Sequence, residues 1–365
     1  MADHAMREAA CDPPTMMIDR RRIGAGEAPY VVAELSANHN GSLERALASI
    51  EAAKAAGADA VKIQSYTADT ITIASDRPEF LIRGGLWDGR RLYDLYQEAH
   101  TPFEWHPALF AKAAELELTL FSSPFDFSAV DLLEDLGAPA YKIASFELID
   151  LPLIRRVART GKPVIMSTGM ASLAEIEEAV AAARGAGCSE LALLHCTSSY
   201  PAPASAANLR TIADLGQRFG VVAGLSDHTL GTAVAVAAVA QGATIVEKHF
   251  MLDGDEDGPD AAFSLTPAQL RQLCNDVRTA WAALGQVCYD RPAEEDGSRR
   301  HRRSLYFVDD IREGEMITPR NLRSIRPGAG LLPRHYEALL SRRAACDIAR
   351  GTPASFDLTR ADAAD

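Results

Sequence analysis

One pattern recurs eight times along this chain: a short apolar segment rich in β-branched residues ends in a polar cluster and is followed by a helical segment. Apolar runs of this length are typical of parallel strands buried on both faces, and the helical segments supply the crossovers that parallel strands require. The strands are expected at 30–35, 60–64, 119–123, 141–143, 163–166, 191–194, 221–225 and 243–246. Eight such units within about 260 residues predict an α/β fold, the (β/α)8 TIM barrel.

A doubly wound open sheet is the alternative arrangement of alternating strands and helices. Such sheets more often carry a GxGxxG fingerprint after their first strand. Here the first expected strand is followed by Asn38-His39-Asn40-Gly41. The barrel is therefore the favoured fold.

The chain is longer than one barrel requires, so further parts are expected at its ends. Residues 1–25 predict a loose arm and a short hairpin that closes the bottom of the barrel, which spans 26–285. A charged linker with turn residues follows at 286–303. Residues 304–365 contain short strand-like runs and turns such as Arg326-Pro327-Gly328, which predict a small β-rich domain.

Polar clusters follow the carboxyl ends of the expected strands, the face at which such barrels keep their active sites. A long excursion at 66–100, containing Gly84-Gly85-Leu86-Trp87-Asp88-Gly89, predicts a lid or binding loop there. Two of the polar clusters end in histidine, His228 and His249, on strands expected to be neighbours. Two converging imidazoles indicate a site for a divalent metal whose remaining positions are open to water or substrate. The alternative is two histidines that are hydrogen-bonded separately near the core.

Lysine is rare in this chain, and its positions are informative. Only six of the 37 basic residues are lysines, and three of them, Lys62, Lys142 and Lys248, lie in or at the end of expected strands. An ammonium is a compact charge that a guanidinium fork does not replace in a tight phosphate or imine site. Together with serine and threonine at several strand ends, the lysines favour a phosphate-binding site, and the histidine pair favours polarisation of a carbonyl group.

The net charge of −13 argues against nucleic acid as a partner. No apolar run approaches the roughly 20 residues of a membrane-spanning helix. The six cysteines lack CxxC spacing, and no leader-like apolar stretch begins the sequence. A cytoplasmic location is expected.

At these strand ends the sequence resembles the sialic acid synthase family, from about residue 17 to the end. Within that family the excursion and the segment 145–150 are most similar to the pseudaminic acid synthase branch. The stretches that carry the resemblance are Ala33-Glu34-Leu35-Ser36-Ala37-Asn38-His39-Asn40-Gly41, Val61-Lys62-Ile63-Gln64, Phe121-Ser122-Ser123-Pro124-Phe125, Tyr141-Lys142-Ile143-Ala144-Ser145, Met166-Ser167-Thr168-Gly169-Met170, Leu194-His195-Cys196-Thr197-Ser198-Ser199-Tyr200-Pro201, Gly224-Leu225-Ser226-Asp227-His228-Thr229, Glu247-Lys248-His249-Phe250 and Gly258-Pro259-Asp260.

The resemblance implies a transferase that condenses phosphoenolpyruvate with the open-chain aldehyde of a 2,4-diacetamido-2,4,6-trideoxy hexose and releases phosphate. It implies Mn²⁺, with Mg²⁺ or Co²⁺ as alternatives, on His228 and His249, and Glu34 with Gln64 as the groups that handle the proton. Tyr200, Asp260 and Arg326 would contact the sugar, the last from an antifreeze-like (SAF) domain of the partner in a domain-swapped homodimer. Phosphoenolpyruvate would be held by Lys62, Ser123, Lys142, Ser145, Ser167, Ser198 and Ser226.

Three alternatives stay open at the level of sequence. A synthase of this family could use an N-acetylneuraminate or legionaminate precursor instead. A Schiff-base aldolase that uses Lys142 would need no metal. A non-catalytic sugar-binding protein would bind its ligand without releasing phosphate.

Overall fold

The computed structural model describes residues 13–254, 258–290 and 292–361. They form two compact units, which divide between Gly285 and Gln286. The predicted N-terminal arm falls largely on residues 1–12, which lie outside the described residues. In the described part of the chain, no helix combines the length and the apolar character needed to span a membrane.

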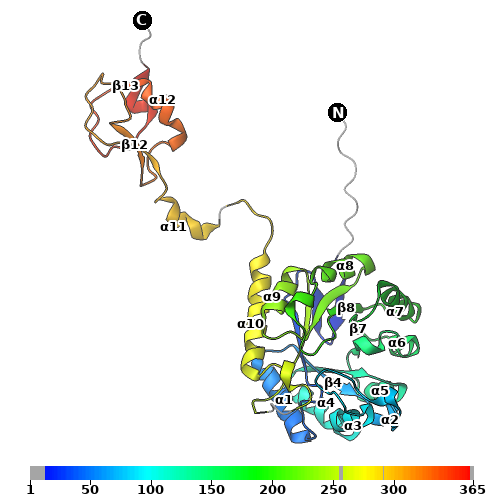
Figure 1. The fold of residues 1–365 in the computed structure, drawn as a ribbon. Coiled ribbons are helices and arrows are strands. Elements are labelled where there is room, and N and C mark those ends of the chain that lie inside the picture. The colour runs from blue at the N-terminus through cyan, green and yellow to red at the C-terminus, as the bar shows by residue number, and fades with distance from the viewer. Residues whose placement is uncertain (1–12, 255–257, 291, 362–365) are drawn as a thin grey trace, which may run out of the picture. The chain divides into compact units, whose positions relative to one another are not determined.

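Eight parallel strands close into a barrel in the first unit, which confirms the predicted fold (Figure 1). Each strand pairs with the next along the chain, and the last pairs with the first. The strands are β3 (Tyr30–Glu34), β4 (Ala60–Ser65), β5 (Thr119–Pro124), β6 (Tyr141–Ile143), β7 (Val164–Ser167), β8 (Leu191–Cys196), β9 (Val222–Asp227) and β10 (Ile245–His249).

Helices cover the outside of the barrel, and their ends are set by local capping. Ser172 begins α7 with a capping box, its hydroxyl accepting from the amide of Glu175, and Gly57 ends α1 in the left-handed region at φ 93°. The outer helices are α1 (Leu43–Ala56), α4 (His106–Glu115), α5 (Phe127–Asp135), α6 (Leu151–Ala158), α7 (Leu173–Gly185), α8 (Arg210–Phe219), α9 (Ala233–Ala240) and α10 (Pro267–Leu284).

The excursion after β4 is partly helical, whereas the sequence pattern predicts a loop. It contains α2 (Ala68–Ile71), the 3₁₀ turn η1 (Pro78–Phe80), α3 (Leu92–Ala99) and η2 (Phe103–Trp105). Of the residues of α3, Leu95 is the buried one. Such a short helix with one buried apolar contact gives little periodicity to detect in the sequence.

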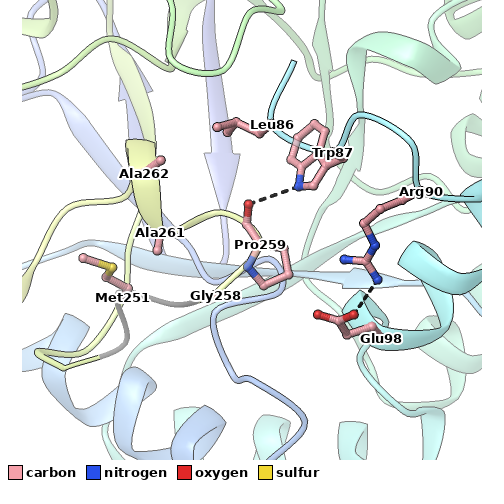
Figure 2. Close-up of a pocket in the computed structure, with 9 residues that line it drawn as sticks. All are labelled: Leu86, Trp87, Arg90, Glu98, Met251, Gly258, Pro259, Ala261 and Ala262. Carbon is pink, nitrogen blue, oxygen red and sulfur yellow. Dashed lines mark hydrogen bonds and ion pairs between the residues drawn. The ribbon is translucent and has the colours of Figure 1, made fainter. Parts of the chain in front are cut away.

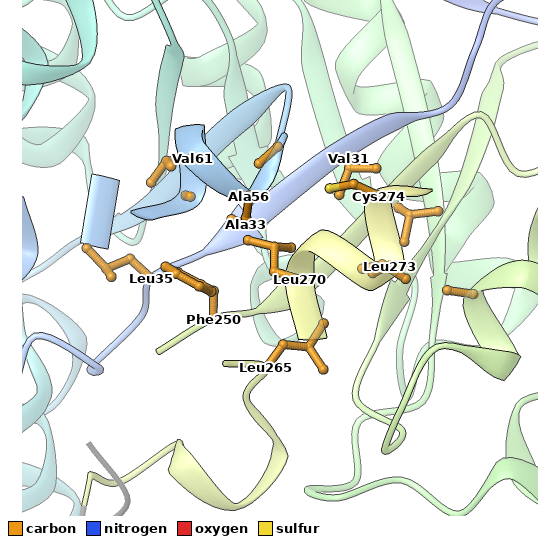
Figure 3. Packing of buried hydrophobic residues seen from close by; sticks show 14 of the residues in the cluster. Val31, Ala33, Leu35, Ala56, Val61, Phe250, Leu265, Leu270, Leu273 and Cys274 are labelled. Atoms are coloured by element: carbon orange, nitrogen blue, oxygen red, sulfur yellow. The ribbon is translucent and has the colours of Figure 1, made fainter. Parts of the chain in front are cut away.

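The two faces of each barrel strand have different roles because side chains alternate along a strand. In β3, Val31 and Ala33 face outward and pack with α1 and α10, as Figure 3 shows. Tyr30 and Val32 face inward. Glu34 follows the inward set at the carboxyl end, so the alternation itself delivers its carboxylate to the barrel mouth.

The lower half of the barrel is filled with apolar side chains. The hairpin of β1 (Thr15–Ile18) and β2 (Arg21–Gly24) contributes Met16, Ile18 and Ile23 to this cluster. A filled lower half confines polar chemistry to the opposite, carboxyl-terminal end.

The second unit has its own core, which includes Leu305, Phe307 and Leu322. Its first part, predicted as a linker, contains η6 (Ala293–Glu295) and α11 (Asp296–Arg299). The remaining elements are β11 (Ser304–Phe307), β12 (Leu322–Ile325), η7 (Pro333–His335), α12 (Tyr336–Leu340), β13 (Arg342–Ala344), η8 (Phe356–Leu358) and β14 (Thr359–Ala361). Two antiparallel pairs, β11–β12 and β13–β14, make it the small β-rich domain expected.

Candidate active site

Two lysines and two glutamates meet inside the barrel mouth. Lys62 Nζ lies 3.1 Å from Glu34 Oε2 and 3.1 Å from Glu247 Oε1, and Lys142 Nζ lies 3.5 Å from the same Glu247 oxygen. All four side chains are buried. Buried charges persist only when they are paired, so one carboxylate, that of Glu247, serves both ammonium groups.

The pKa values of the two carboxyl groups in the cluster, Glu34 and Glu247, shift in opposite directions. Burial raises the pKa of Glu34 despite the neighbouring Lys62. Burial also acts to raise the pKa of Glu247, but Lys142 and Lys62 outweigh it and lower the value to about 2. Burial lowers the pKa of Lys142. Glu247 is thus the fixed anion of the cluster, and Glu34 is the carboxyl group that takes up a proton more readily.

Gln64 holds the Glu34 carboxyl group in place. Its Nε2 donates to Glu34 Oε1 at 2.8 Å and to Ser36 Oγ at 2.9 Å. Glu34 and Gln64 therefore lie side by side at the barrel mouth, as the sequence predicts. Lys62 and Gln64 share the inward face of β4, since they are two residues apart.

Serine hydroxyls from separate strand ends surround the lysine cluster. Lys62 Nζ donates to Ser123 Oγ at 3.4 Å, and Ser226 Oγ donates to Glu247 Oε1 at 3.4 Å. Ser167 Oγ is buried and lacks a hydrogen-bond partner among the described residues. An orphaned buried hydroxyl costs free energy unless a ligand satisfies it, so this atom favours a bound polar group.

Gly169 allows two further hydroxyls to approach. Its amide donates to Ser145 Oγ at 3.2 Å. A Cβ atom on Gly169 would lie 2.2 Å from Ser198 Oγ and 2.8 Å from Ser145 Oγ. The structure thus brings all seven residues predicted to hold phosphoenolpyruvate to one end of the barrel.

The two predicted metal-binding histidines face each other. The ring centroids of His228 and His249 are 5.3 Å apart. His228 Nδ1 contacts the carbonyl oxygen of Thr197 at 3.1 Å and Cys196 Sγ at 3.7 Å, which leaves Nε2 as the nitrogen available to a ligand. Burial acts to lower the pKa of His228, but the contacts with Cys196 outweigh it and the net shift is upward.

The donor set fits a divalent ion with open positions. His249 Nδ1 is buried without a hydrogen bond, and Asp260 Oδ2 lies 3.6 Å from it. Burial and the nearby positive groups, His228 first among them, lower the pKa of His249 well below its usual value, so this imidazole is neutral and able to ligate. Among the described residues, no group of three or more His, Cys, Asp or Glu side chains is arranged to hold a metal. The protein would therefore contribute few ligands, and substrate or water the rest.

Aromatic side chains form the other wall of the mouth. The Tyr200 ring lies 4.5 Å from His228 and 5.1 Å from Phe263, measured between centroids. Phe263 in turn lies 4.8 Å from His249. Burial raises the pKa of Asp260. Tyr200 and Asp260, predicted to contact the sugar, thus both adjoin the histidine pair.

Two other candidates stand apart from this cluster. Lys248 Nζ pairs with Asp227 Oδ2 at 2.6 Å and donates to the carbonyl of Thr229, so Lys248 forms a structural ion pair between β10 and β9 and is not a third lysine of the cluster. Arg326 follows β12 in the second unit. Its contact with a sugar stays a prediction.

Sequence reasoning assigned no role to two residues of the site, although Glu247 is one of the acids at the expected strand ends. Glu247 binds both lysines, and the signal was available, because a residue two positions before His249 shares its strand face. Phe263 touches both histidines. It comes from the segment between β10 and α10, where no periodicity indicates which side chain turns inward.

Comparison with known proteins covers both units. The model of the NeuB family matches residues 49–289, and that of the SAF domain matches residues 302–358. The chain is 43% identical over 330 residues to a pseudaminic acid synthase of Helicobacter pylori, with 90% of this chain and 97% of the relative covered. A pseudaminic acid synthase of Campylobacter jejuni is 45% identical over 322 residues, with 88% and 94% covered.

A solved structure has the same architecture. The N-acetylneuraminic acid synthetase of Leptospira borgpetersenii, crystallised with citrate, superposes with a TM-score of 0.70 at 29% identity. The match covers 78% of this chain and 95% of that chain.

Proposed function

The chain belongs to the NeuB family, and on that basis we propose that it condenses phosphoenolpyruvate with 2,4-diacetamido-2,4,6-trideoxy-L-altrose to give pseudaminic acid and phosphate. The observation that carries the proposal is the adjacency of a lysine and hydroxyl cluster to a histidine pair in one barrel mouth. The first cluster suits a phosphorylated enol acid. The second suits the aldehyde with which it reacts.

Lys62 and Lys142 would hold the anionic groups of phosphoenolpyruvate, assisted by the serine hydroxyls around them. Two features support this assignment. The Ser167 hydroxyl is buried without a hydrogen-bond partner among the described residues. The hydroxyls of Ser145 and Ser198 pack closely against Gly169, in a space that we call the Gly169 niche. Ser198, at the same niche, belongs to the set. These groups fix the orientation of the enol so that its C3 faces the sugar side of the mouth.

The reaction forms one carbon–carbon bond and breaks one bond to phosphate. C3 of phosphoenolpyruvate attacks the aldehyde carbon, whose oxygen takes up a proton. Water then adds to C2 of the resulting oxocarbenium ion, and the tetrahedral intermediate releases phosphate to leave the 2-keto acid. Glu34 is the candidate to deliver or accept the proton, because burial raises its pKa and Gln64 holds it in place.

A divalent ion, Mn²⁺ with Mg²⁺ or Co²⁺ as alternatives, would be held by His228 and His249 and would polarise the aldehyde carbonyl. Thr197 fixes the ring of His228 through Nδ1. Histidines that bind a metal commonly contact a backbone carbonyl oxygen in this way through their other ring nitrogen.

The assembly proposed is a domain-swapped homodimer, in which Arg326 of one chain reaches the barrel of its partner. Charge supports it: residues 1–285 contain 37 acidic and 23 basic residues, whereas 286–365 contain 13 and 14. The second unit is therefore suited to approach an acidic barrel. A reducing cytoplasm is proposed as the compartment, because the five cysteines among the described residues are all free.

The test is phosphate release from phosphoenolpyruvate with a panel of N-acyl hexosamines, with and without a chelator. Release with the diacetamido trideoxy sugar, lost on chelation, is the expected result. Activity that persists without metal would select the Schiff-base alternative, and release with a neuraminate or legionaminate precursor alone would reassign the substrate.

Matched lysine variants locate the site. Lys62→Met is expected to abolish release. Lys54→Met, on α1, removes an ammonium that only donates to the carbonyl of Glu117 at the surface and is expected to leave the rate unchanged. Equal rates for Lys62→Met and the unaltered protein would contradict the proposed site.

A further inference from the structure

The segment 82–90 of the excursion folds into a compact turn. The amide of Ile82 donates to the carbonyl of Arg90, and the amide of Gly89 donates back to the carbonyl of Ile82, each at 2.9 Å. Gly84, Gly85 and Gly89 all have positive φ, the region that favours glycine. The backbone therefore holds this turn in one shape and presents Trp87 from it.

Trp87 contacts two residues at the barrel mouth, Pro259 and Tyr200. Its Nε1 donates to the carbonyl oxygen of Pro259 at 3.2 Å, as Figure 2 shows. Its ring lies 5.9 Å from the ring of Tyr200, between centroids. Pro259 directly precedes Asp260, so the indole contacts the two barrel segments that carry Tyr200 and Asp260, two of the predicted sugar-binding residues.

These contacts extend the aromatic wall outward from the histidines. His228 touches Tyr200, and Tyr200 touches Trp87. Trp87 thus lies two ring contacts away from His228, one of the two predicted metal-binding histidines. Aromatic faces of this kind bind the apolar faces and methyl groups of ligands.

A cavity of ≈ 490 Å³ lies beside the indole. Its lining combines the apolar side chains of Leu86, Trp87, Met251, Pro259, Ala261 and Ala262 with polar groups that include Arg90 and Glu98. At one edge Arg90 donates to Glu98 at 2.5 Å (Figure 2). A cavity that combines apolar side chains with a few polar groups is typical of a small-molecule subsite.

We propose that Trp87 and this cavity form the subsite for the end of the sugar remote from its reacting carbon, with the indole as the specificity-determining side chain. The inference rests on the proposed function. In a 2,4-diacetamido-2,4,6-trideoxy hexose that end carries a C6 methyl group and an acetamido methyl group, both of which match the apolar lining. The Arg90 guanidinium, which has donors beyond the one given to Glu98, faces the same space and suits the amide oxygen.

Steady-state kinetics of two Trp87 variants test the subsite. Trp87→Ala is expected to raise the KM of the diacetamido trideoxy sugar by about 10- to 100-fold, the range for loss of an apolar contact in a binding pocket, while the KM of phosphoenolpyruvate stays within about twofold. Trp87→Phe keeps a ring against Tyr200 but loses the hydrogen bond to Pro259, so an intermediate KM is expected. The ratio of kcat/KM for this sugar to kcat/KM for an N-acyl hexosamine with a C6 hydroxyl group should fall slightly in Trp87→Phe and further in Trp87→Ala.

Phe127→Ala is the matched control, because Phe127 is an aromatic residue at the start of α5, is 51% exposed and is not part of the aromatic wall of Trp87, Tyr200 and Phe263. It should change neither KM. Thermal unfolding of each variant separates loss of fold from loss of binding.

The outcomes distinguish this inference from the proposed function. If the unaltered protein releases phosphate with none of the N-acyl sugars, the proposed function fails and the subsite fails with it. If the unaltered protein is active and folded Trp87→Ala retains the sugar KM, the subsite alone is refuted. A parallel rise in both KM values would also refute it, since that result indicates a general disturbance of the mouth.

Discussion

Replacing Glu147 by glutamine is expected to stabilise the barrel at alkaline pH and to have little effect in mild acid. Glu147 ends the short turn after β6, and one of its carboxyl oxygens is buried without a hydrogen bond. Burial raises the pKa of this carboxyl group from 4.5 to about 7. The folded protein therefore keeps a proton on Glu147 over a range in which the unfolded chain has lost it.

The direction in which stability changes with pH follows from proton linkage. Between the two pKa values the folded state binds more protons than the unfolded state, so stability falls as pH rises through this window. The shift corresponds to about 3 kcal/mol when fully developed above pH 7, and to less than about 1 kcal/mol near pH 5. Glutamine is close in shape to the protonated acid and does not titrate, so Glu147→Gln removes this cost.

Thermal unfolding followed by circular dichroism at about pH 5 and about pH 8 measures the effect. For a domain of this size 1 kcal/mol shifts Tm by roughly 2 °C, so Glu147→Gln should gain about 6 °C at the higher pH and about 2 °C or less at the lower. The control is Glu178→Gln on the exposed face of α7, which changes charge equally and should move Tm by about 1 °C or less. A gain that is equal at both pH values, or absent at the higher one, would refute the titration of Glu147 as the cause.

Three further predictions follow from the site and its support. Gly169→Ala places a methyl group against the Ser198 hydroxyl and should raise the KM of phosphoenolpyruvate by about tenfold, the equivalent of one hydrogen bond; an unchanged KM would count against the niche. Lys248→Met leaves Asp227 buried without its partner and should lower the free energy of unfolding by about 3–5 kcal/mol in urea, and equal stability would show that the ion pair does not matter. Tm should rise with increasing Mn²⁺ concentration, because binding stabilises the folded protein by about 2.7 kcal/mol when the ion is present at 100 times its Kd. His249→Ala should lose this shift, and a retained shift would place the ion elsewhere.

The barrel could be predicted from the sequence because its signal is local. Each strand is a short apolar run, each helix follows within a few residues, and the polar strand ends mark one face. The alternation of side chains then places Lys62, Gln64 and His249 on the inward face without further information. Relation to a known family of synthases is confirmed by the comparisons.

The remaining features depend on contacts between distant segments, which periodicity does not encode. Trp87 meets Pro259 across 172 positions, and that meeting depends on the shape of a glycine-rich turn. Lys248 lies near a strand end as Lys62 and Lys142 do, yet its ammonium group meets Asp227 on the neighbouring strand β9, 21 positions away. The shared use of Glu247 by two lysines likewise arises only when β4, β6 and β10 close around one space.

The carboxylate of Glu247 occupies the position beside Lys62 and Lys142 for which a bound anion must compete. Because Glu247 already pairs with Lys62 and Lys142, a chloride ion from solution gains less by entering, since it competes with a carboxylate that is part of the barrel wall. A ligand succeeds only if it brings several acceptor oxygens in the right places and satisfies the hydroxyls as well. The carboxylate that pairs with both lysines thereby favours an anion with several acceptor oxygens over one with a single contact.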